Sequence, residues 1–329
     1  MKAAIRRNYC APNQLKIESV DKPGPKENEV LIRVYATTVN RTDCANLIAK
    51  PFFMRFVLGL FKPRKIIVGT DFAGEVLSIG KNIKSINIGD RVFGFNDTGS
   101  ESQAEYLTTV DENIFTIPKN IDFKQAAASI EGAHYAYSFI HKVNIKSGHR
   151  ILINGATGGI GSALLQFVRQ YDVKITATCS TKNIELIKKL GADEIVDYTK
   201  EDFTDKDGNY DFVFDTVGKS TFGKCKALLN KKGVSISSEL GPYSQNVFYP
   251  LFNSISNKKV IFPIPYNKRE TIPFIISHLE KGSFKPVIDR EDQLKDISKA
   301  YEYVIKGEKI GNVIINVKNN ESTTKPKLH

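Results

Sequence analysis

Residues 150–168 read RILINGATGGIGSALLQFV, in which an apolar run, a glycine-rich corner and a second apolar run follow one another. The first run, residues 151–154, is typical of a strand buried in a parallel sheet. The second run, residues 162–168, is typical of a buried helix. The stretch therefore predicts a strand over Arg150–Gly155, a tight turn, and a helix over Gly161–Tyr171.

A glycine-rich corner between a strand and a helix suits a phosphorylated ligand. The first backbone N–H groups of the helix point outward there, and glycine leaves no Cβ in the way of a pyrophosphate. The position of the motif between a predicted strand and a predicted helix matches the dinucleotide-binding fingerprint. The alternative is a tight turn without a ligand. We expect these corner residues to bind a dinucleotide: Gly155, Ala156, Thr157, Gly158, Gly159, Ile160 and Gly161.

The residues that follow the next predicted strand favour NADPH over NADH. NAD-binding proteins place an acidic residue there, about 20 residues beyond the glycines, to bind the ribose 2′-hydroxyl. Here Ser180, Thr181 and Lys182 stand instead, and no acid precedes Glu185. A helix cap at Ser180 or Thr181 with a solvent-facing Lys182 is the alternative. Tyr198, after a further strand, either stacks near the phosphate or is a strand-end aromatic.

Strands and helices alternate on the C-terminal side of the corner, which predicts right-handed βαβ units and a parallel sheet. The predicted strands are Lys174–Cys179, Glu194–Tyr198, Asp211–Asp215, Gly233–Ser238 and Lys259–Pro265, and the predicted helices are Asn183–Leu190 and Phe222–Asn230. From Lys268 onward the pattern is a helix, a loop, a helix over Leu294–Lys306 and a strand over Gly311–Val317.

The N-terminal third is rich in short strands punctuated by glycine, which predicts a barrel-like β unit. These strands are Lys2–Arg6, Gln14–Ser19, Glu29–Thr38, Gly74–Ile79, Arg91–Phe95 and Glu105–Thr109. An alanine-rich helical stretch over Phe123–Lys142 separates them from the corner.

Composition indicates a soluble chain of more than one domain. Its 329 residues are 41% hydrophobic and 25% charged, and no apolar run is long enough to span a membrane. The N-terminal residues lack the apolar region of a secretory signal, so we expect a cytoplasmic protein without a membrane partner. The net charge of +11 comes from scattered lysines without a nucleic-acid-binding motif.

The four cysteines lie far apart with no CxxC spacing, which favours free thiols over disulfides or a zinc knot. They are Cys10, Cys44, Cys179 and Cys225.

Several segments together resemble one family. They are VGTDFAGEV (68–76), GDRVFG (89–94), the glycine corner, LGAD (190–193), FDTVG (214–218) and GSFKPVI (282–288). From Met1 to Val317 the chain resembles the medium-chain dehydrogenase/reductase superfamily, in its zinc-independent, quinone-oxidoreductase-like (zeta-crystallin-like) branch. The resemblance implies an α/β protein with a GroES-like β-barrel catalytic domain (1–121) and a Rossmann domain with a doubly wound parallel sheet (122–266). A return segment (267–329) with a polar tail would complete the catalytic domain.

The resemblance also implies that catalytic zinc is absent. The positions of the zinc ligands in zinc-dependent relatives are occupied here by Asn40, Thr70 and Glu131, which make a poor zinc site. No cysteine lies between Cys44 and Cys179, so the lobe that binds structural zinc is also missing.

The activity implied is NADPH-dependent hydride transfer to a quinone or an α,β-unsaturated carbonyl, because such acceptors need only a hydrogen bond and a proton. Asn40, Thr70 and Tyr135 are the implied catalytic residues. The alternatives are that Asn40 only caps a helix and that His134 and Tyr135 are packed helix residues. Further cofactor contacts are implied at Thr216, Val217, Gly218, Leu240 and Asn312.

The resemblance further implies a small hydrophobic electrophile as substrate and a homodimer. Two alternatives stay open, an NADPH-binding regulatory protein without turnover and an NAD(P)-dependent alcohol dehydrogenase.

Overall fold

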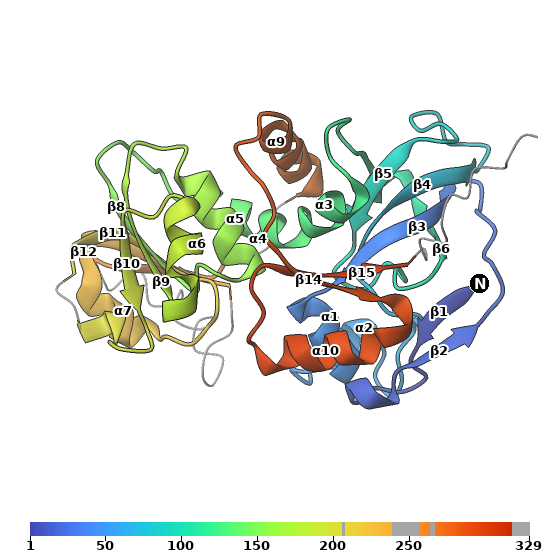
Figure 1. Cartoon of the computed structure of the whole chain (residues 1–329), viewed down its shortest axis with the longest axis horizontal. Helices are drawn as coiled ribbons and strands as arrows, with labels where there is room; N and C mark the ends of the chain where they lie inside the picture. Colours follow the sequence, from blue (N-terminus) through green and yellow to red (C-terminus); the bar gives the residue numbers. More distant parts are fainter. Residues whose placement is uncertain (206–207, 239–256, 264–266, 318–329) are drawn as a thin grey trace, which may run out of the picture. The chain divides into compact units, whose positions relative to one another are not determined.

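The computed structural model describes residues 1–205, 208–238, 257–263 and 267–317, which form two compact units (Figure 1). Unit 1 combines Met1–Ala128 with the described residues from Ile288 onward, and unit 2 is Ser129–Val287. The division therefore falls after residues 128 and 287, whereas the sequence placed domain boundaries after residues 121 and 266.

Unit 2 contains a parallel sheet with the strand order of a Rossmann domain. Within the described residues the sheet has six strands in the order β10-β9-β8-β11-β12-β13, and every pair is parallel. In chain order the strands are β8 (Arg150–Asn154), β9 (Lys174–Cys179), β10 (Glu194–Asp197), β11 (Tyr210–Asp215), β12 (Leu229–Ser237) and β13 (Lys259–Ile261). The order reverses between β8 and β11, and ligands bind at the carboxyl ends of strands at such a point.

Helices cover the strands of unit 2 in the expected alternation (Figure 1). They are α4 (Glu131–His141), α5 (Gly159–Val168), α6 (Ile184–Lys189), α7 (Phe222–Leu228) and α9 (Lys268–Glu280). The core strand residues Ile151, Leu152 and Ile153 are at most 1% exposed, as the apolar run of β8 predicts. The predicted α/β fold with a parallel Rossmann sheet is confirmed.

Helix α5 explains why unit 2 extends to Val287. The Gln166 side chain donates to the Lys285 carbonyl at 3.0 Å and accepts from the Lys285 N–H at 2.9 Å. Beside it, the Phe167 ring lies 5.0 Å from the rings of both Phe274 and Phe284, centroid to centroid. These contacts attach α9 and the following loop to unit 2.

Unit 1 is built on a mixed sheet around an apolar core, in which β14 and β15 pair in parallel and the other pairs are antiparallel. Among the described residues a seven-stranded sheet runs in the order β14-β15-β3-β4-β5-β7, with β6 paired to β3, and β1 pairs with β2 separately. The strands are β1 (Lys2–Ile5), β2 (Lys16–Ser19), β3 (Glu29–Val39), β4 (Asp71–Ile79), β5 (Arg91–Phe95), β6 (Tyr106–Val110), β7 (Phe115–Thr116), β14 (Ile288–Gln293) and β15 (Asn312–Asn316). This is the GroES-like part of the predicted fold.

The helices of unit 1 are α1 (Arg41–Ile48), α2 (Met54–Leu58), α3 (Phe123–Ala128) and α10 (Ile297–Lys306). Helix α3 belongs to this unit because the Phe123 ring stacks on Tyr35 of β3 with centroids 4.4 Å apart. The Arg91 guanidinium also lies 4.8 Å from the Phe123 ring. These contacts place the unit boundary after Ala128.

Three local expectations were wrong. The helical stretch 123–142 forms two helices, α3 and α4, rather than one. The predicted helix Phe222–Asn230 ends at Leu228, because β12 already begins at Leu229. Strand β14, which pairs with β15, falls in the predicted loop; its sequence IDREDQ is polar and only half-buried, so it carries little strand signal.

No helix within the described residues is long and apolar enough to cross a membrane.

The first prediction concerns the contact between Gln166 and Lys285. Gln166→Ala should lower the free energy of unfolding by about 1–3 kcal/mol, because it leaves both Lys285 backbone groups without their partner. Denaturant unfolding of the full chain measures the change. Gln170→Ala is the matched control, because the exposed Gln170 amide donates only to the nearby Gln166 carbonyl. Equal stability of the two variants would contradict the assigned role of Gln166.

Candidate functional site

The glycines of the corner have different structural roles. Gly155 follows β8 with φ of +81°, and a Cβ there would lie 2.4 Å from Val217 Cγ1. A Cβ at Gly161 would lie 2.2 Å from the Gly155 carbonyl oxygen. At Gly158, by contrast, the only neighbour within 4 Å among the described residues is that same oxygen, at an ordinary 3.6 Å. Packing requires glycine at positions 155 and 161, and Gly158 instead leaves open space at the start of the helix.

The helix that follows presents hydrogen-bond donors. Helix α5 is capped by Gly158, which has no side chain to accept from the first turn. Gly159, Ile160 and Gly161 form the first turn of the helix, so their N–H groups have no carbonyl within the helix to bind. The helix dipole adds partial positive charge at this end. Open space and amides that lack an acceptor within their own helix together fit the diphosphate of a dinucleotide.

A buried polar network holds the corner in place. Thr178 of β9 accepts from the Gly155 N–H at 3.0 Å and donates to Asn154 Oδ1 at 2.7 Å. The Asn154 amide then donates to Asp215 Oδ1 at 3.0 Å. All three side chains are at most 6% exposed, so the network joins the ends of β9, β8 and β11.

The FDTVG segment is folded around Asp215. Its carboxylate accepts from the N–H groups of Val217 at 3.2 Å and Gly218 at 3.1 Å, although burial raises the pKa of this carboxyl. The Thr216 hydroxyl donates inward, to the carbonyls of Asn154 at 2.9 Å and Gly155 at 3.1 Å. Thr216, Val217 and Gly218 therefore border the corner, with the Thr216 hydroxyl committed to the backbone.

An acid of the neighbouring strand β10 lies beside the end of β9, which the sequence alone did not reveal. Asp197, at the end of the neighbouring β10, accepts from the Thr181 hydroxyl and, at 2.6 Å, from the Thr199 hydroxyl. These bonds lower the pKa of the Asp197 carboxyl to about 2. Lys200 lies 3.7 Å from this carboxylate and partly balances its charge. The Thr181 hydroxyl is thus bound to Asp197 at the carboxyl ends of β9 and β10.

The other residues expected at this edge remain accessible to different degrees. Ser180 is buried and accepts from the Asn183 amide at 3.1 Å. Lys182 is exposed, and the Tyr198 side chain is 54% exposed while its backbone N–H donates to Cys179. Sequence reasoning missed Asp197 because it considered only acids that follow β9 along the chain.

Unit 1 holds a second buried polar cluster, around Asn40. The Asn40 amide nitrogen donates to Thr70 Oγ1 at 2.8 Å and to Asp71 Oδ2 at 3.2 Å. Its amide oxygen accepts from the Asp43 N–H at 2.7 Å and caps α1. Asn40 therefore caps the helix, as one interpretation of the sequence expected, and its amide nitrogen donates to two neighbouring side chains. A catalytic role for Asn40 stays a prediction.

Asp71 anchors this cluster. It accepts from the Thr38 N–H at 2.8 Å and from the Thr38 hydroxyl at 2.6 Å, and it is 1% exposed. Burial raises the pKa of Asp71 to about 6 even though these donors oppose the shift. Thr70 accepts from Asn40 and so keeps a hydroxyl hydrogen that can be offered to another acceptor.

The remaining predicted residues lie elsewhere. Tyr135 is half-buried in α4 of unit 2, with its ring 5.9 Å from that of His134. Burial lowers the pKa of His134 to about 4, so its imidazole is neutral at neutral pH. Asn312 is buried in β15 of unit 1, and Leu240 lies outside the described residues.

The donor set of the cluster does not suit zinc. Asn40 and Thr70 bind each other, and neither is a ligand type that holds zinc in proteins. Within the described part of the chain no three His, Cys, Asp or Glu side chains are grouped to hold a metal ion. The four cysteines are free thiols, as expected.

Sequence reasoning missed Gly132 as well. A Cβ at this α4 glycine would lie 2.9 Å from the Gly159 carbonyl carbon, so α4 packs directly on the first turn of α5. The signal was present, because Gly132 stands between Glu131 and Tyr135, which the resemblance singled out. Only the crossing of the two helices explains it.

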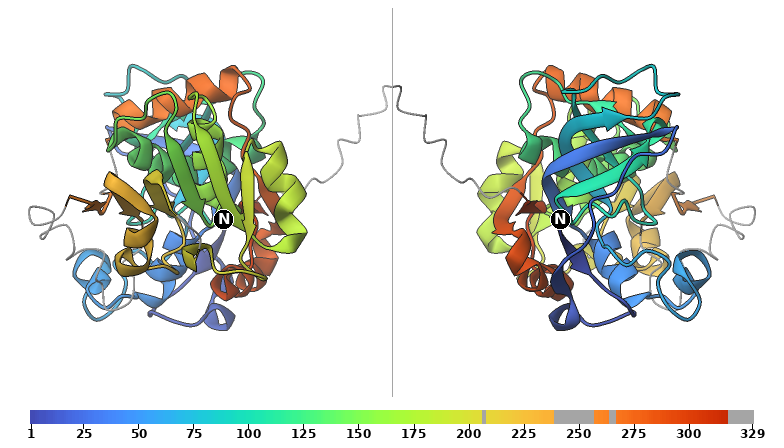
Figure 2. Two further views of the ribbon diagram at one scale, coloured as in Figure 1. Left: turned by 90° about the vertical axis from the view of Figure 1, so that its left-hand side faces the viewer. Right: turned by 90° about the vertical axis from the view of Figure 1, so that its right-hand side faces the viewer.

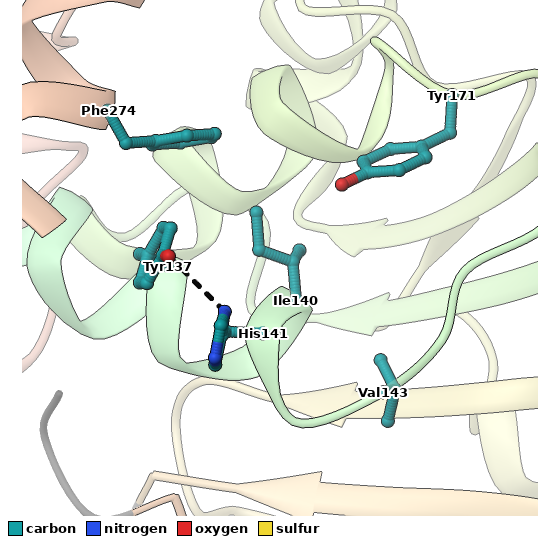
Figure 3. Close-up of a pocket in the computed structure, with 6 residues that line it drawn as sticks. All are labelled: Tyr137, Ile140, His141, Val143, Tyr171 and Phe274. Carbon is teal, nitrogen blue, oxygen red and sulfur yellow. Dashed lines mark hydrogen bonds between the residues drawn. The ribbon is translucent and has the colours of Figure 1, made fainter. Parts of the chain in front are cut away.

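A pocket of about 270 Å³ lies apart from the corner (Figure 3). Tyr137, Ile140, His141 and Tyr171 are among its lining residues, at the C-terminal ends of α4 and α5. The corner is at the opposite end of α5, which is about 15 Å long. This pocket is therefore not the dinucleotide site.

Comparison with known proteins is consistent with both units. The family model described as "Alcohol dehydrogenase GroES-like domain" matches residues 26–145, and that described as "Zinc-binding dehydrogenase" matches residues 190–315. The chain is 34% identical to the 2-methylene-furan-3-one reductase of Solanum lycopersicum, over 96% of this chain and 79% of that protein. It is 30% identical to the chloroplastic NADPH-dependent alkenal/one oxidoreductase of Arabidopsis thaliana, with the same coverage.

Two further similarities extend over nearly the whole chain. The Homo sapiens quinone oxidoreductase is 28% identical over 93% of this chain and 94% of that protein. Among solved structures, the quinone oxidoreductase from Coxiella burnetii has a TM-score of 0.86 at 24% identity, covering 97% of this chain and 99% of that one. The structural likeness supports the fold.

The second prediction concerns Asp71. Its pKa is 3.8 in an ordinary carboxyl and about 6 in the folded protein, so the folded state binds more protons between these values. The free energy of unfolding should fall as the pH rises through this range, by on the order of 3 kcal/mol from this group. Asp71→Asn should remove that dependence, as denaturant unfolding at several pH values would measure.

Asp21→Asn, which removes an exposed carboxyl, is the control for this measurement. If the Asp71→Asn variant and the wild-type protein lose stability in parallel as the pH rises, Asp71 is not the group responsible.

Proposed function

Because this chain belongs to the zinc-independent, quinone-oxidoreductase-like branch of the medium-chain dehydrogenase/reductase superfamily, we propose that it is an NADPH-dependent oxidoreductase that transfers hydride to a quinone or an α,β-unsaturated carbonyl. The family expected from the motifs is thereby confirmed. The relatives named above as enone, alkenal/one and quinone oxidoreductases support this activity over the alternatives.

The observation that carries the proposal is the space left at Gly158. Gly155 and Gly161 are explained by the backbone turn and by close packing, whereas no described residue lies close enough to require the absence of a Cβ at Gly158. A diphosphate on the amides of Gly159, Ile160 and Gly161 accounts for that space. When bound there, the nicotinamide dinucleotide supplies the hydride.

The polar cluster around Asn40 provides a role for the protein in the reaction. Reduction of a conjugated carbonyl leaves negative charge on its oxygen, and a hydrogen-bond donor stabilises that charge. The Thr70 hydroxyl, held by Asn40, keeps one hydrogen for this purpose. We propose Tyr135 as the proton donor, since the low pKa of His134 leaves its imidazole neutral, without an imidazolium proton to donate, at neutral pH.

Enones and quinones suit this donor set better than alcohols. Alcohol oxidation depends on a group that lowers the alcohol pKa, and zinc performs this role in the zinc-dependent relatives. The Thr70 hydroxyl, which accepts from the Asn40 amide, offers a hydrogen bond instead. The alcohol-dehydrogenase alternative therefore has less support from these residues.

We propose NADPH rather than NADH as the preferred coenzyme. Ser180, Thr181 and Lys182 follow β9, where a 2′-phosphate would lie. The nearby Asp197 carboxylate is occupied by threonine hydroxyls and lies close to Lys200, which reduces its repulsion of a phosphate. The exposed Lys182 would supply the opposing charge.

Two further proposals concern the state of the protein. Within the described residues β13 is the outer strand of the parallel sheet of unit 2, and an unpaired edge of this kind can be covered by a second copy of the chain. We therefore propose a homodimer. We also propose a cytoplasmic location. The word chloroplastic in the name of the Arabidopsis thaliana relative describes that protein and not this one.

A panel of quinones and enones tests the function. The protein is mixed with NADPH and each compound, and nicotinamide absorbance is followed. Turnover of at least one compound is expected. Tight NADPH binding without turnover of any compound would instead favour the regulatory alternative, and stoichiometric zinc after purification would favour the alcohol-dehydrogenase alternative.

The third prediction is that Gly158→Ala weakens NADPH binding. A methyl group in the open space should raise the dissociation constant at least about tenfold, which corresponds to about 1.4 kcal/mol, because it obstructs the diphosphate. The melting temperature should stay near the wild-type value, since the nearest atom is at an ordinary distance. Fluorescence titration and thermal unfolding measure the two effects.

Gly223→Ala is the matched control for Gly158→Ala. Among the described residues a Cβ at Gly223 also has a single neighbour, the Thr221 hydroxyl oxygen at 3.7 Å, but Gly223 lies in the first turn of α7 and not in α5. Wild-type NADPH affinity in the Gly158→Ala variant would exclude the corner as the coenzyme site.

The fourth prediction is that Lys182→Ala acts on NADPH alone. Loss of a charge-assisted bond to the 2′-phosphate should raise the KM for NADPH about tenfold and leave the KM for NADH unchanged. Steady-state kinetics with both coenzymes measures this, with the exposed Lys189→Ala on α6 as control. An equal effect on both coenzymes would assign Lys182 a different role.

A further inference from the structure

The segment around α2 exposes an unusual amount of apolar surface. Large hydrophobic side chains normally scatter singly over a protein surface, and contiguous exposed groups mark interaction sites. Six such side chains, which we call the α2 patch, are Phe52 (63% exposed), Phe53 (56%), Phe56 (65%), Val57 (56%), Leu60 (43%) and Phe61 (88%). Figure 2 shows this light-blue segment at the margin of unit 1.

The α2 patch is held on unit 1 by contacts beneath it. Leu58 is 6% exposed, and the Tyr9 hydroxyl donates to the Gly59 carbonyl at 2.5 Å. The Arg55 guanidinium lies 4.9 Å from the Tyr9 ring. Gly59 has φ of +125°, and a Cβ there would lie 2.1 Å from the Lys62 carbonyl oxygen, so the turn after α2 requires glycine. The fold therefore presents these aromatic side chains outward in a defined arrangement.

Only positive charges accompany the α2 patch along the chain. Residues 44–70 contain no Asp or Glu, but they contain Lys50, Arg55, Lys62, Arg64 and Lys65. Arg55 lies over aromatic rings, and Lys65 donates to the Gly99 carbonyl at 2.6 Å. Lys50, Lys62 and Arg64 are exposed, and none of them forms an ion pair with a described carboxylate.

We propose that the α2 patch docks this protein onto an anionic lipid surface. Phenylalanine and leucine side chains enter the boundary between headgroups and acyl chains, and lysine and arginine on the same face attract anionic headgroups. A second copy of the chain fits less well, because a two-fold contact would set the patch against itself and oppose like charges. The patch combines the two features that a lipid surface recognises.

This inference goes beyond the proposed reductase activity and does not depend on it. It departs from the sequence-based expectation of no membrane partner, which rested on the lack of a spanning segment. A surface contact needs no spanning helix. It would also bring the protein close to hydrophobic electrophiles dissolved in the bilayer.

Vesicle co-sedimentation tests the proposal. The full chain is mixed with phosphatidylcholine vesicles, with or without phosphatidylserine. Binding should rise on the order of tenfold or more with phosphatidylserine, because each basic side chain near such a surface contributes about 1 kcal/mol. High salt should reverse that increase. Absence of binding to phosphatidylserine vesicles would overturn the proposal.

Two variants separate the apolar from the charged contribution. Phe53→Ser with Phe61→Ser, and separately Lys62→Glu with Arg64→Glu, should each reduce binding about tenfold or more. The control, Ile88→Ser with Lys119→Glu, removes an exposed apolar side chain and an exposed cation outside the patch and should bind as the wild-type protein does. Thermal unfolding checks that each variant is folded.

Other results would assign the α2 patch differently and refute docking to lipid. Folded patch variants that bind vesicles as well as the control would do so. If light scattering showed that the patch variants are monomers while the wild-type protein is a dimer, with vesicle binding intact, the α2 patch would be a contact between two copies of the chain. If the patch variants had a raised KM for a water-soluble quinone, again with vesicle binding intact, the α2 patch would be a substrate-binding surface.

Discussion

The close approach of helix α5 to the end of strand β8 is the constraint on which unit 2 depends. The Gly155 carbonyl oxygen occupies the place of a Cβ at Gly161, so any side chain at that position would push the helix from the strand. Gly132 extends the same constraint to α4, which packs on the first turn of α5. Because the helix starts so near the strand, its first amides stand at the point where the strand order reverses, where doubly wound sheets bind ligands.

Buried carboxyl groups fix the backbone in both units. Asp215 accepts from two backbone N–H groups at the end of β11, and Asp71 accepts from backbone and hydroxyl groups of Thr38. Burial raises the pKa of both carboxyl groups, because removing the charged form from water is unfavourable. The hydrogen bonds that each carboxylate accepts partly offset this desolvation. Such networks define one arrangement of strand ends more sharply than apolar packing alone.

The polar cluster of unit 1 and the glycine corner of unit 2 have different chemical tasks in the proposed reaction. The corner needs open space and backbone amides, and the cluster needs oriented side-chain donors. The Asn40 amide oxygen accepts from the Asp43 N–H at the start of α1, and its amide nitrogen donates to the Thr70 hydroxyl oxygen. Because Thr70 accepts this bond, its hydroxyl hydrogen can be donated elsewhere. The α2 patch is a separate property of unit 1, set by an exposed apolar segment whose neighbouring charges are all positive.

The sequence by itself determined the strand, the glycine corner and the helix that follows it, because each depends on residues adjacent in the chain. It also determined the alternation that gives a parallel sheet, and the family. Only the tertiary structure showed that Asp197 on β10 engages Thr181 after β9, that Thr178 and Asp215 hold Asn154, and that the polar strand β14 pairs with β15. These contacts join residues distant in the chain, and a periodic pattern carries no information about which distant side chains will meet.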